Sequence, residues 1–176
     1  AMLTPTPKYV PTELRVDTPE NKECRIFEYN NRQYEVWNNG QIFSLPYTVE
    51  CLNHGKPCVR EYEKKEVKPT LKPDGYYSVR LGGKTGGNMQ HHKVLALCFV
   101  HNPNPTIKTQ VNHIDGNRSN NSISNLEWVT PEENTRHAIS IGNKEITPRF
   151  RYLTHKNGIK YSGELLEDII NMRNNG

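Results

Sequence analysis

Apolar and polar residues alternate through much of the first half of the chain, and a period of two is typical of β-strands. The clearest stretch is residues 32–45, where the alternation continues on both sides of Asn39-Gly40. An Asn-Gly pair between two such runs predicts a β-hairpin with a type I′ turn. Residues 74–81 predict another strand, and a glycine-rich segment, residues 82–87, follows it. The first half of the chain therefore predicts a small antiparallel β module.

After residue 90 the pattern changes. Residues 91–99 predict a short apolar helix, which residues 102–105 (Asn-Pro-Asn-Pro) would end because proline cannot extend a helix. Residues 109–114 and 126–130 predict two short strands around a loop that is rich in asparagine, glycine and serine, residues that favour turns. The second half therefore begins with a helix and continues with a strand pair.

A second helix is predicted directly after this strand pair. Thr130 fits its N-cap, Pro131 its first helical position, and Glu133 completes a capping box. The helix can run to Ile141, with Gly142 as its stop. Strand, loop, strand and helix together form a ββα unit.

The last part of the chain gives a weaker pattern. Residues 153–161 predict a hairpin around Asn157-Gly158, and residues 163–173 predict an amphipathic helix. Either this helix packs on the core, or the chain has been cut short.

Composition limits the class of protein only slightly. With 176 residues, of which 34% are hydrophobic, the chain can form one compact domain or two small lobes. No apolar run approaches the ~20 residues of a membrane-spanning helix, and we find no secretory signal, so we expect a cytoplasmic protein without a membrane partner. The net charge of +4 and a pI near 8.8 mildly favour a polyanionic partner.

The four cysteines give no clear metal site. Cys51, His54 and Cys58 have a spacing that resembles half of a zinc site, but the other ligands would have to come from the isolated Cys24 or Cys98. We therefore do not expect a structural zinc ion. Reduced thiols are the default in a cytoplasmic protein.

The side chains best suited to catalysis and cation binding lie between positions 111 and 137, in the run VNHIDGNRSNNSISNLEWVTPEENTRH. His113 suits the role of a general base, because imidazole titrates near neutral pH and can take a proton from water. On the predicted helix, Asn134 and His137 share one face. A plain asparagine-rich loop before a core strand would explain each residue singly, but it would not explain their joint spacing.

This run resembles the HNH nucleases of the ββα-metal group, and within that group the homing endonucleases of phages. The motif appears here as His113-Ile114-Asp115-Gly116-Asn117, Asn120-Asn121, Asn125-Leu126-Glu127-Trp128-Val129-Thr130 and Asn134. Residues 92–99 and 34–44 also resemble segments that often precede HNH domains. The resemblance implies an α+β fold, in which a ββα-metal nuclease core follows a small antiparallel β module and precedes a helical C-terminal tail.

We accordingly expect four segments. They are an N-terminal arm at 1–23, a β-rich DNA-binding module at 24–87, an HNH ββα-metal nuclease domain at 88–142, and a C-terminal tail at 143–176 that either contacts DNA or is truncated.

The resemblance also implies roles for single residues. His113 would be the general base, and Asn112 and Asn134 would hold one divalent cation, Mg²⁺ or Mn²⁺. Asn125 would brace the loop so that His113 keeps its orientation. Many relatives carry Asp where this chain has Asn112, and an uncharged amide oxygen should bind these cations more weakly.

Two further candidates for the metal site remain open. Asp115 could be a substitute ligand, but Asp-Gly is also ordinary turn chemistry, and we favour the turn. His137 could be a third ligand, a phosphate contact or a solvated helix residue, since neutral histidine suits transition metals better than Mg²⁺.

We expect contacts with double-stranded DNA from His92, Lys93, Lys84, Arg118 and Arg136. His92 could instead cap a buried helix, and Lys84 could lie in a plain flexible connector. Other basic residues recur on both sides of the HNH motif, and we interpret them as flanking DNA contacts, with a solvated surface as the alternative.

These observations predict a metal-dependent DNA endonuclease of the homing type, acting as a monomer or weak dimer and cutting one or both strands at a specific site. The N-terminal strands and the tail would recognise DNA while the ββα unit cleaves it. One rival is a DNA-binding protein whose HNH fold no longer cleaves, for which Asn112 is the best argument. A second rival is a structure-specific or RNA-directed nuclease.

Overall fold

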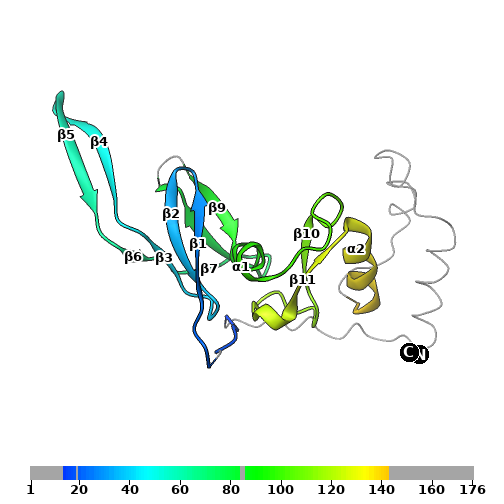
Figure 1. Ribbon diagram of the computed structural model, residues 1–176. Helices are drawn as coiled ribbons and strands as arrows, with labels where there is room; N and C mark the ends of the chain where they lie inside the picture. Colours follow the sequence, from blue (N-terminus) through cyan, green and yellow to red (C-terminus); the bar gives the residue numbers. More distant parts are fainter. Residues whose placement is uncertain (1–13, 19, 84–85, 143–176) are drawn as a thin grey trace, which may run out of the picture.

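The computed structural model describes residues 14–18, 20–83 and 86–142, and this part of the chain forms an α+β fold of small antiparallel sheets and two helices (Figure 1). The expectations for the C-terminal tail, for most of the N-terminal arm and for Lys84 lie outside these residues. No helix among the described residues is long and apolar enough to cross a membrane.

The N-terminal module is built on a four-stranded antiparallel sheet, as the alternating pattern predicts. Its strands, in spatial order, are β1 (Cys24–Tyr29), β2 (Arg32–Trp37), β3 (Ile42–Ser44) and β6 (Lys65–Glu66). The hairpin predicted over residues 32–45 is therefore confirmed as β2 and β3.

The type I′ turn predicted at Asn39-Gly40 is wrong. A type I′ turn needs positive φ at both central residues, whereas Gly40 has φ +82° and Asn39 is not among the described residues with positive φ. The Gly40 N–H donates to the Trp37 carbonyl, which makes a three-residue connection with glycine last. Glycine is also needed for space, because a Cβ there would lie 2.6 Å from Val16 Cγ1.

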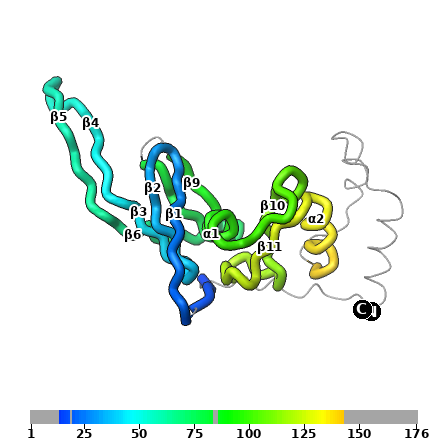
Figure 2. The backbone as a smooth tube through the Cα atoms, in the orientation of Figure 1, coloured from blue at the N-terminus to red at the C-terminus, as the bar shows by residue number. Residues whose placement is uncertain are grey.

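A long second hairpin, β4 (Tyr47–Asn53) and β5 (Lys56–Tyr62), was not predicted. Figures 1 and 2 show it projecting at the end of the molecule away from helix α2 (Pro131–Ser140). Its tip is His54-Gly55, and both residues have positive φ. Cys51 and Cys58 lie opposite each other on the two strands, with their Sγ atoms 2.6 Å apart.

A three-stranded antiparallel sheet connects this module to the rest of the chain. It consists of β7 (Thr70–Leu71), β8 (Tyr77–Leu81) and β9 (Gly87–Gln90), with β8 in the centre. The strand predicted over residues 74–81 thus begins at Tyr77. Helix α1 (His91–Phe99) follows β9 directly and matches the predicted apolar helix.

The hydrophobic core runs through both halves of the chain. Val36 of β2 and Ile42 of β3 are almost fully buried in the same cluster as Leu81 of β8, Leu95 of α1 and Leu126, the first residue of β11 (Leu126–Val129). Burying one such side chain stabilises a fold by about 1.5–3 kcal/mol. The core therefore crosses the expected boundary at residue 87, and the β module and the ββα unit support each other.

The ββα unit has the predicted elements. Strand β10 (Gln110–His113) pairs antiparallel with β11 (Leu126–Val129), the short 3₁₀ helix η2 (Ile123–Asn125) leads into β11, and α2 (Pro131–Ser140) follows. The predicted capping box is present: the Glu133 N–H donates to Thr130 Oγ1, and the Thr130 N–H donates to the Glu133 carboxylate.

Candidate active site

A small cleft of about 320 Å³ lies where β10, the following loop and α2 meet. The polar residues that line it include Asn112, His113, Arg118, Asn134 and His137. Four of these five residues were predicted as base or ligands, so the fold gathers at one place the side chains that the sequence singles out.

His113 ends β10 and is almost fully buried beneath the cleft, with 4% of its surface exposed. Its Nε2 lies 2.8 Å from Asn121 Oδ1. Its ring packs edge-on against that of His92, with centroids 4.7 Å apart. The ring of Tyr76 lies beside both, with its centroid 6.0 Å from that of His113 and 5.3 Å from that of His92. Burial lowers the pKa of His113 below its ordinary value, while the hydrogen bond to Asn121 acts in the opposite direction. The ring is therefore held in place and favours its neutral form.

The other ring nitrogen of His113, Nδ1, has no hydrogen-bond partner among the described residues. Within that part of the chain, the fully buried side-chain polar atoms that lack a partner are Trp37 Nε1, His92 Nδ1 and Arg136 Nε. Nδ1 of His113 is not one of them, so it keeps access to the cleft, where a base could take a proton from water.

Asn112 and Asn134 both have their amide nitrogens occupied. Asn112 Nδ2 donates to Glu127 Oε1 across the strand pair at 2.8 Å, and Asn134 Nδ2 donates to Gln110 Oε1 at 2.7 Å. An ionised carboxylate can only accept a hydrogen bond, so the Asn112 amide must turn its Nδ2 toward Glu127 and its Oδ1 away from it. Neither Oδ1 accepts a hydrogen bond from the described residues, and both residues line the cleft.

These residues fit a hard divalent cation. Mg²⁺ prefers oxygen ligands, keeps several waters, and is commonly held by one or two protein groups together with substrate phosphate. Two carboxamide oxygens beside one cleft match that requirement. No group of three or more His, Cys, Asp or Glu side chains is placed to hold a metal ion in the described ranges.

Asp115 and Asn125 instead build the loop. Asp115 Oδ1 accepts from the Asn117 N–H and from Asn125 Nδ2, and its Oδ2 accepts from Asn120 Nδ2. Partial burial alone would raise the pKa of Asp115, but these hydrogen bonds hold it below its ordinary value. Asn125 also accepts from the Asp115 N–H and donates to the Asn120 carbonyl. Both carboxylate oxygens are thus used within the turn.

His137 is tied to the loop as well. Its Nε2 lies 3.1 Å from the carbonyl oxygen of Ile114, so this nitrogen donates and is not available to a metal ion. The contact joins α2 to the end of β10, on the wall of the cleft. Ligation would have to use Nδ1.

The residues expected to contact DNA lie in different surroundings. Arg118 lines the cleft, where it donates to the Asp74 carbonyl and lies 5.0 Å from the Tyr76 ring centroid. Arg136 pairs with Glu132 on α2, and Lys93 is half-buried on α1. His92 is only 3% exposed and packs on His113, which differs from a solvent-facing phosphate contact.

Sequence reasoning missed the partners that hold the site. Asn121 binds His113, and Glu127 and Gln110 hold the two candidate ligands. Glu127 could have been found, because strand pairing places it directly opposite Asn112. Asn121 could not, because the loop conformation decides which of several asparagines faces the histidine.

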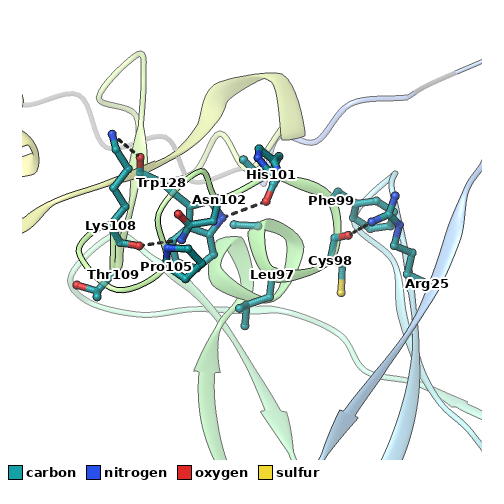
Figure 3. Close-up of a pocket in the computed structure, with 12 residues that line it drawn as sticks. Arg25, Leu97, Cys98, Phe99, His101, Asn102, Pro105, Lys108, Thr109 and Trp128 are labelled. Atoms are coloured by element: carbon teal, nitrogen blue, oxygen red, sulfur yellow. Dashed lines mark hydrogen bonds between the residues drawn. The ribbon is translucent and has the colours of Figure 1, made fainter.

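A larger groove, about 640 Å³, lies elsewhere, at the C-terminal end of α1 (Figure 3). Arg25 donates there to the Cys98 carbonyl, and Asn102 donates to the Lys108 carbonyl. These side chains bind backbone carbonyls and so stabilise the turn after α1. None of the predicted site residues lines this groove.

Residues 103–136, which contain the strand pair and most of α2, match the HNH endonuclease family. The uncharacterised HNH endonuclease L245 of Acanthamoeba polyphaga mimivirus is 31% identical over 143 residues, which cover 77% of this chain and 38% of that protein. The DNA endonuclease I-HmuI of Bacillus phage SP01 is 29% identical over 116 residues, which cover 65% of this chain and 56% of that protein.

A solved structure on DNA binding and cleavage by the HNH homing endonuclease I-HmuI is 27% identical. It has a TM-score of 0.48 and covers 70% of this chain and 62% of that one. The chain thus spans about two fifths of L245 and just over half of I-HmuI.

The antiparallel strand pair, the capped helix and the buried His113 beside their cleft form a ββα unit with its site at the junction of the elements. Residues 103–136 therefore belong to the HNH endonuclease family, and the chain is similar over most of its length to proteins named as HNH or DNA endonucleases, one of them from a phage.

Proposed function

We propose that this protein is an endonuclease that hydrolyses phosphodiester bonds of double-stranded DNA with the help of one divalent cation, Mg²⁺ or Mn²⁺. The observation that carries the proposal is the cleft itself. It gathers an accessible nitrogen of His113 and the amide oxygens of Asn112 and Asn134, which accept no hydrogen bond from the described part of the chain.

The chemistry follows from these groups. His113 Nδ1 takes a proton from a water molecule, whose oxygen then attacks the phosphorus atom. The bond between phosphorus and the 3′ oxygen breaks, leaving a 5′-phosphate and a 3′-hydroxyl. Asn112 and Asn134 would hold the cation, which polarises the phosphate and stabilises the departing oxygen when bound. Arg118 at the cleft can position a phosphate by charge-assisted hydrogen bonds.

A DNA-binding protein without cleavage is the second candidate, and the neutral Asn112 favours it. Sequencing of the ends released from a library of random duplexes, incubated with Mg²⁺, Mn²⁺ or EDTA, separates the two. We expect 5′-phosphate ends with either cation and none in EDTA, with DNA still bound in EDTA. Binding without released ends in both cations would contradict the proposal.

The same library defines the mode of cleavage. Ends that map to one strand indicate nicking, and paired ends on both strands indicate a double-strand cut. Single-stranded and branched DNAs, offered in separate reactions, test the alternative of a structure-specific nuclease. Cleavage of those substrates alone would contradict the assignment of duplex DNA.

A further inference from the structure

Three hydrogen bonds connect His113 to the turn between β2 and β3. His113 Nε2 lies 2.8 Å from Asn121 Oδ1, and Asn121 Nδ2 lies 2.9 Å from His91 Nδ1. His91 Nε2 in turn lies 2.8 Å from the carbonyl oxygen of Gly40. His91 and Asn121 are completely buried and His113 almost so, hence no water competes along this chain of contacts.

The Gly40 carbonyl sets the direction of every hydrogen bond in the chain. A carbonyl oxygen can only accept, so His91 Nε2 carries a proton. Burial lowers the pKa of His91 to about 4, so near neutral pH its Nδ1 has a lone pair and accepts from Asn121 Nδ2. The Asn121 oxygen then faces His113 and can only accept, which leaves the proton on His113 Nε2.

The opposite arrangement does not fit these contacts. With the Asn121 amide reversed, its oxygen would face the lone pair of His91 Nδ1. A proton on His91 Nδ1 would remove this repulsion, but at a cost. Either His91 Nε2 would lose the proton that it donates to Gly40, or His91 would carry both protons and become a buried cation. A buried donor or acceptor without a partner costs about 1–3 kcal/mol, and a buried charge costs more.

We propose that His91 and Asn121 are positioning residues that hold His113 in its Nε2-protonated form, with Nδ1 left bare to accept a proton at the cleft. This inference rests on the proposed function, because it concerns the base of that reaction. The fixed acceptor is a backbone atom of the β module, so these hydrogen bonds link the two units that also share one core.

The three hydrogen bonds from His113 through Asn121 and His91 to Gly40, here called the relay, can be detected directly by NMR of the full-length, ¹⁵N-labelled protein without DNA or metal. We expect His113 and His91 to be protonated at Nε2 only, and we expect a scalar coupling across the hydrogen bond between Asn121 Nδ2 and His91 Nδ1. A proton on Nδ1 of His113, or the lack of that coupling in a protein whose other slow-exchanging protons are visible, would overturn the proposal.

Two substitutions at one position separate positioning from structural support. Gln in H91Q keeps one donor and one acceptor, whereas Leu in H91L keeps neither. We expect H91Q to retain the slowly exchanging His113 Nε2 proton and most of the single-turnover cleavage rate. H91L should lose that proton and cleave about tenfold more slowly or worse, with DNA affinity within about twofold, since a general base contributes at least that much.

The exposed His101 provides the matched control, and H101L should leave both signals and the rate unchanged. A folded H91L protein with an unchanged His113 proton would overturn the relay. If H91L does not fold, the wild-type spectrum and the H91Q variant still test the relay. Retention of the His113 Nε2 proton in H91Q supports it, and loss of that proton in a folded H91Q protein contradicts it. A wild-type protein that shows both signals and cuts no DNA would contradict the proposed function and leave the relay in place.

Discussion

At the scale of single residues, the most distinctive feature of this site is that Asn112, the proposed cation ligand, is uncharged. Its amide nitrogen binds the Glu127 carboxylate, so the chain has a negative charge beside the site although the ligand itself has none. The sequence predicts Asn112 as a ligand through its position in the motif, and this stays a prediction. It did not show the hydrogen bond from the Asn112 amide nitrogen to Glu127, which leaves the amide oxygen facing away from Glu127.

Asn112→Asp should have opposite effects with and without a cation. Without metal, a carboxylate would face Glu127 where a hydrogen bond now lies, so we expect a loss of about 1–3 kcal/mol in the free energy of unfolding. With Mg²⁺ or Mn²⁺ the added charge should tighten cation binding and restore stability. Denaturant unfolding across a cation titration measures both effects.

The double variant N112D/E127Q is the control, because glutamine can donate to the new carboxylate. It should recover the stability lost without metal. Equal stability of the single variant and the wild type in EDTA, with no gain in cation affinity, would exclude Asn112 as a ligand.

At the scale of secondary structure, the elements with strong local signals were predicted well. The ββα unit and α1 were placed to within about two residues because capping residues and proline define helix ends. The β4–β5 hairpin was missed although its strands alternate, because its tip lacks a common turn pair. The Asn39-Gly40 turn was assigned the wrong type because three residues, 38–40, connect the strands and only Gly40 has positive φ, and the local sequence does not show where the strand pairing ends.

Helix α2 carries Asn134 directly after its capping box, so the box should matter for metal binding. Thr130→Ala removes the acceptor for the Glu133 N–H and should lower the free energy of unfolding by about 1 kcal/mol. A frayed first turn would also raise the cation concentration needed for cleavage. Chemical denaturation and a cation titration of the cleavage rate test this.

The exposed Thr48 on β4 allows a matched change. Thr48→Ala should leave the cation requirement as in the wild type. The idea that α2 capping supports the site fails if Thr130→Ala behaves in the same way as Thr48→Ala in both measurements.

At the scale of the whole molecule, the shared core makes the site depend on distant residues. Ile42 is 1% exposed in β3, and Ile42→Ala should cost about 2–5 kcal/mol of stability. Because this strand follows the Gly40 turn, we also expect slower cleavage. The matched change Ile26→Ala, at a position 57% exposed, should have little effect on either quantity. Equal losses from the two substitutions would argue against one continuous core.

The buried histidines should make the whole fold sensitive to acid. Burial lowers the pKa of His91 to about 4, and burial together with the neighbouring His113 lowers that of His92 to about 3. In the unfolded chain both titrate near 6.5, so below that pH the unfolded state binds more protons. The free energy of unfolding should therefore be highest above pH ~6.5. As the pH decreases below that value, it should fall by about 1.4 kcal/mol per pH unit for each of these histidines.

Denaturant unfolding at a series of pH values between 7.5 and 5 measures this slope. His91→Gln removes one buried histidine and should reduce the slope by the share of that residue, about 1.4 kcal/mol per pH unit. A free energy of unfolding that stays constant or rises as the pH falls to 5 would show that these histidines are not buried in their neutral form.

The central claim is that His113 activates the water that cleaves DNA. The most direct test is the single-turnover cleavage rate of His113→Ala on duplexes that the wild type cuts, measured together with DNA affinity in EDTA. We expect the rate to fall by at least about 100-fold while affinity changes little, since phosphate contacts dominate binding, and we expect the exposed His101→Ala to match the wild type. A folded His113→Ala protein that cleaves at a rate near that of the wild type would contradict the account.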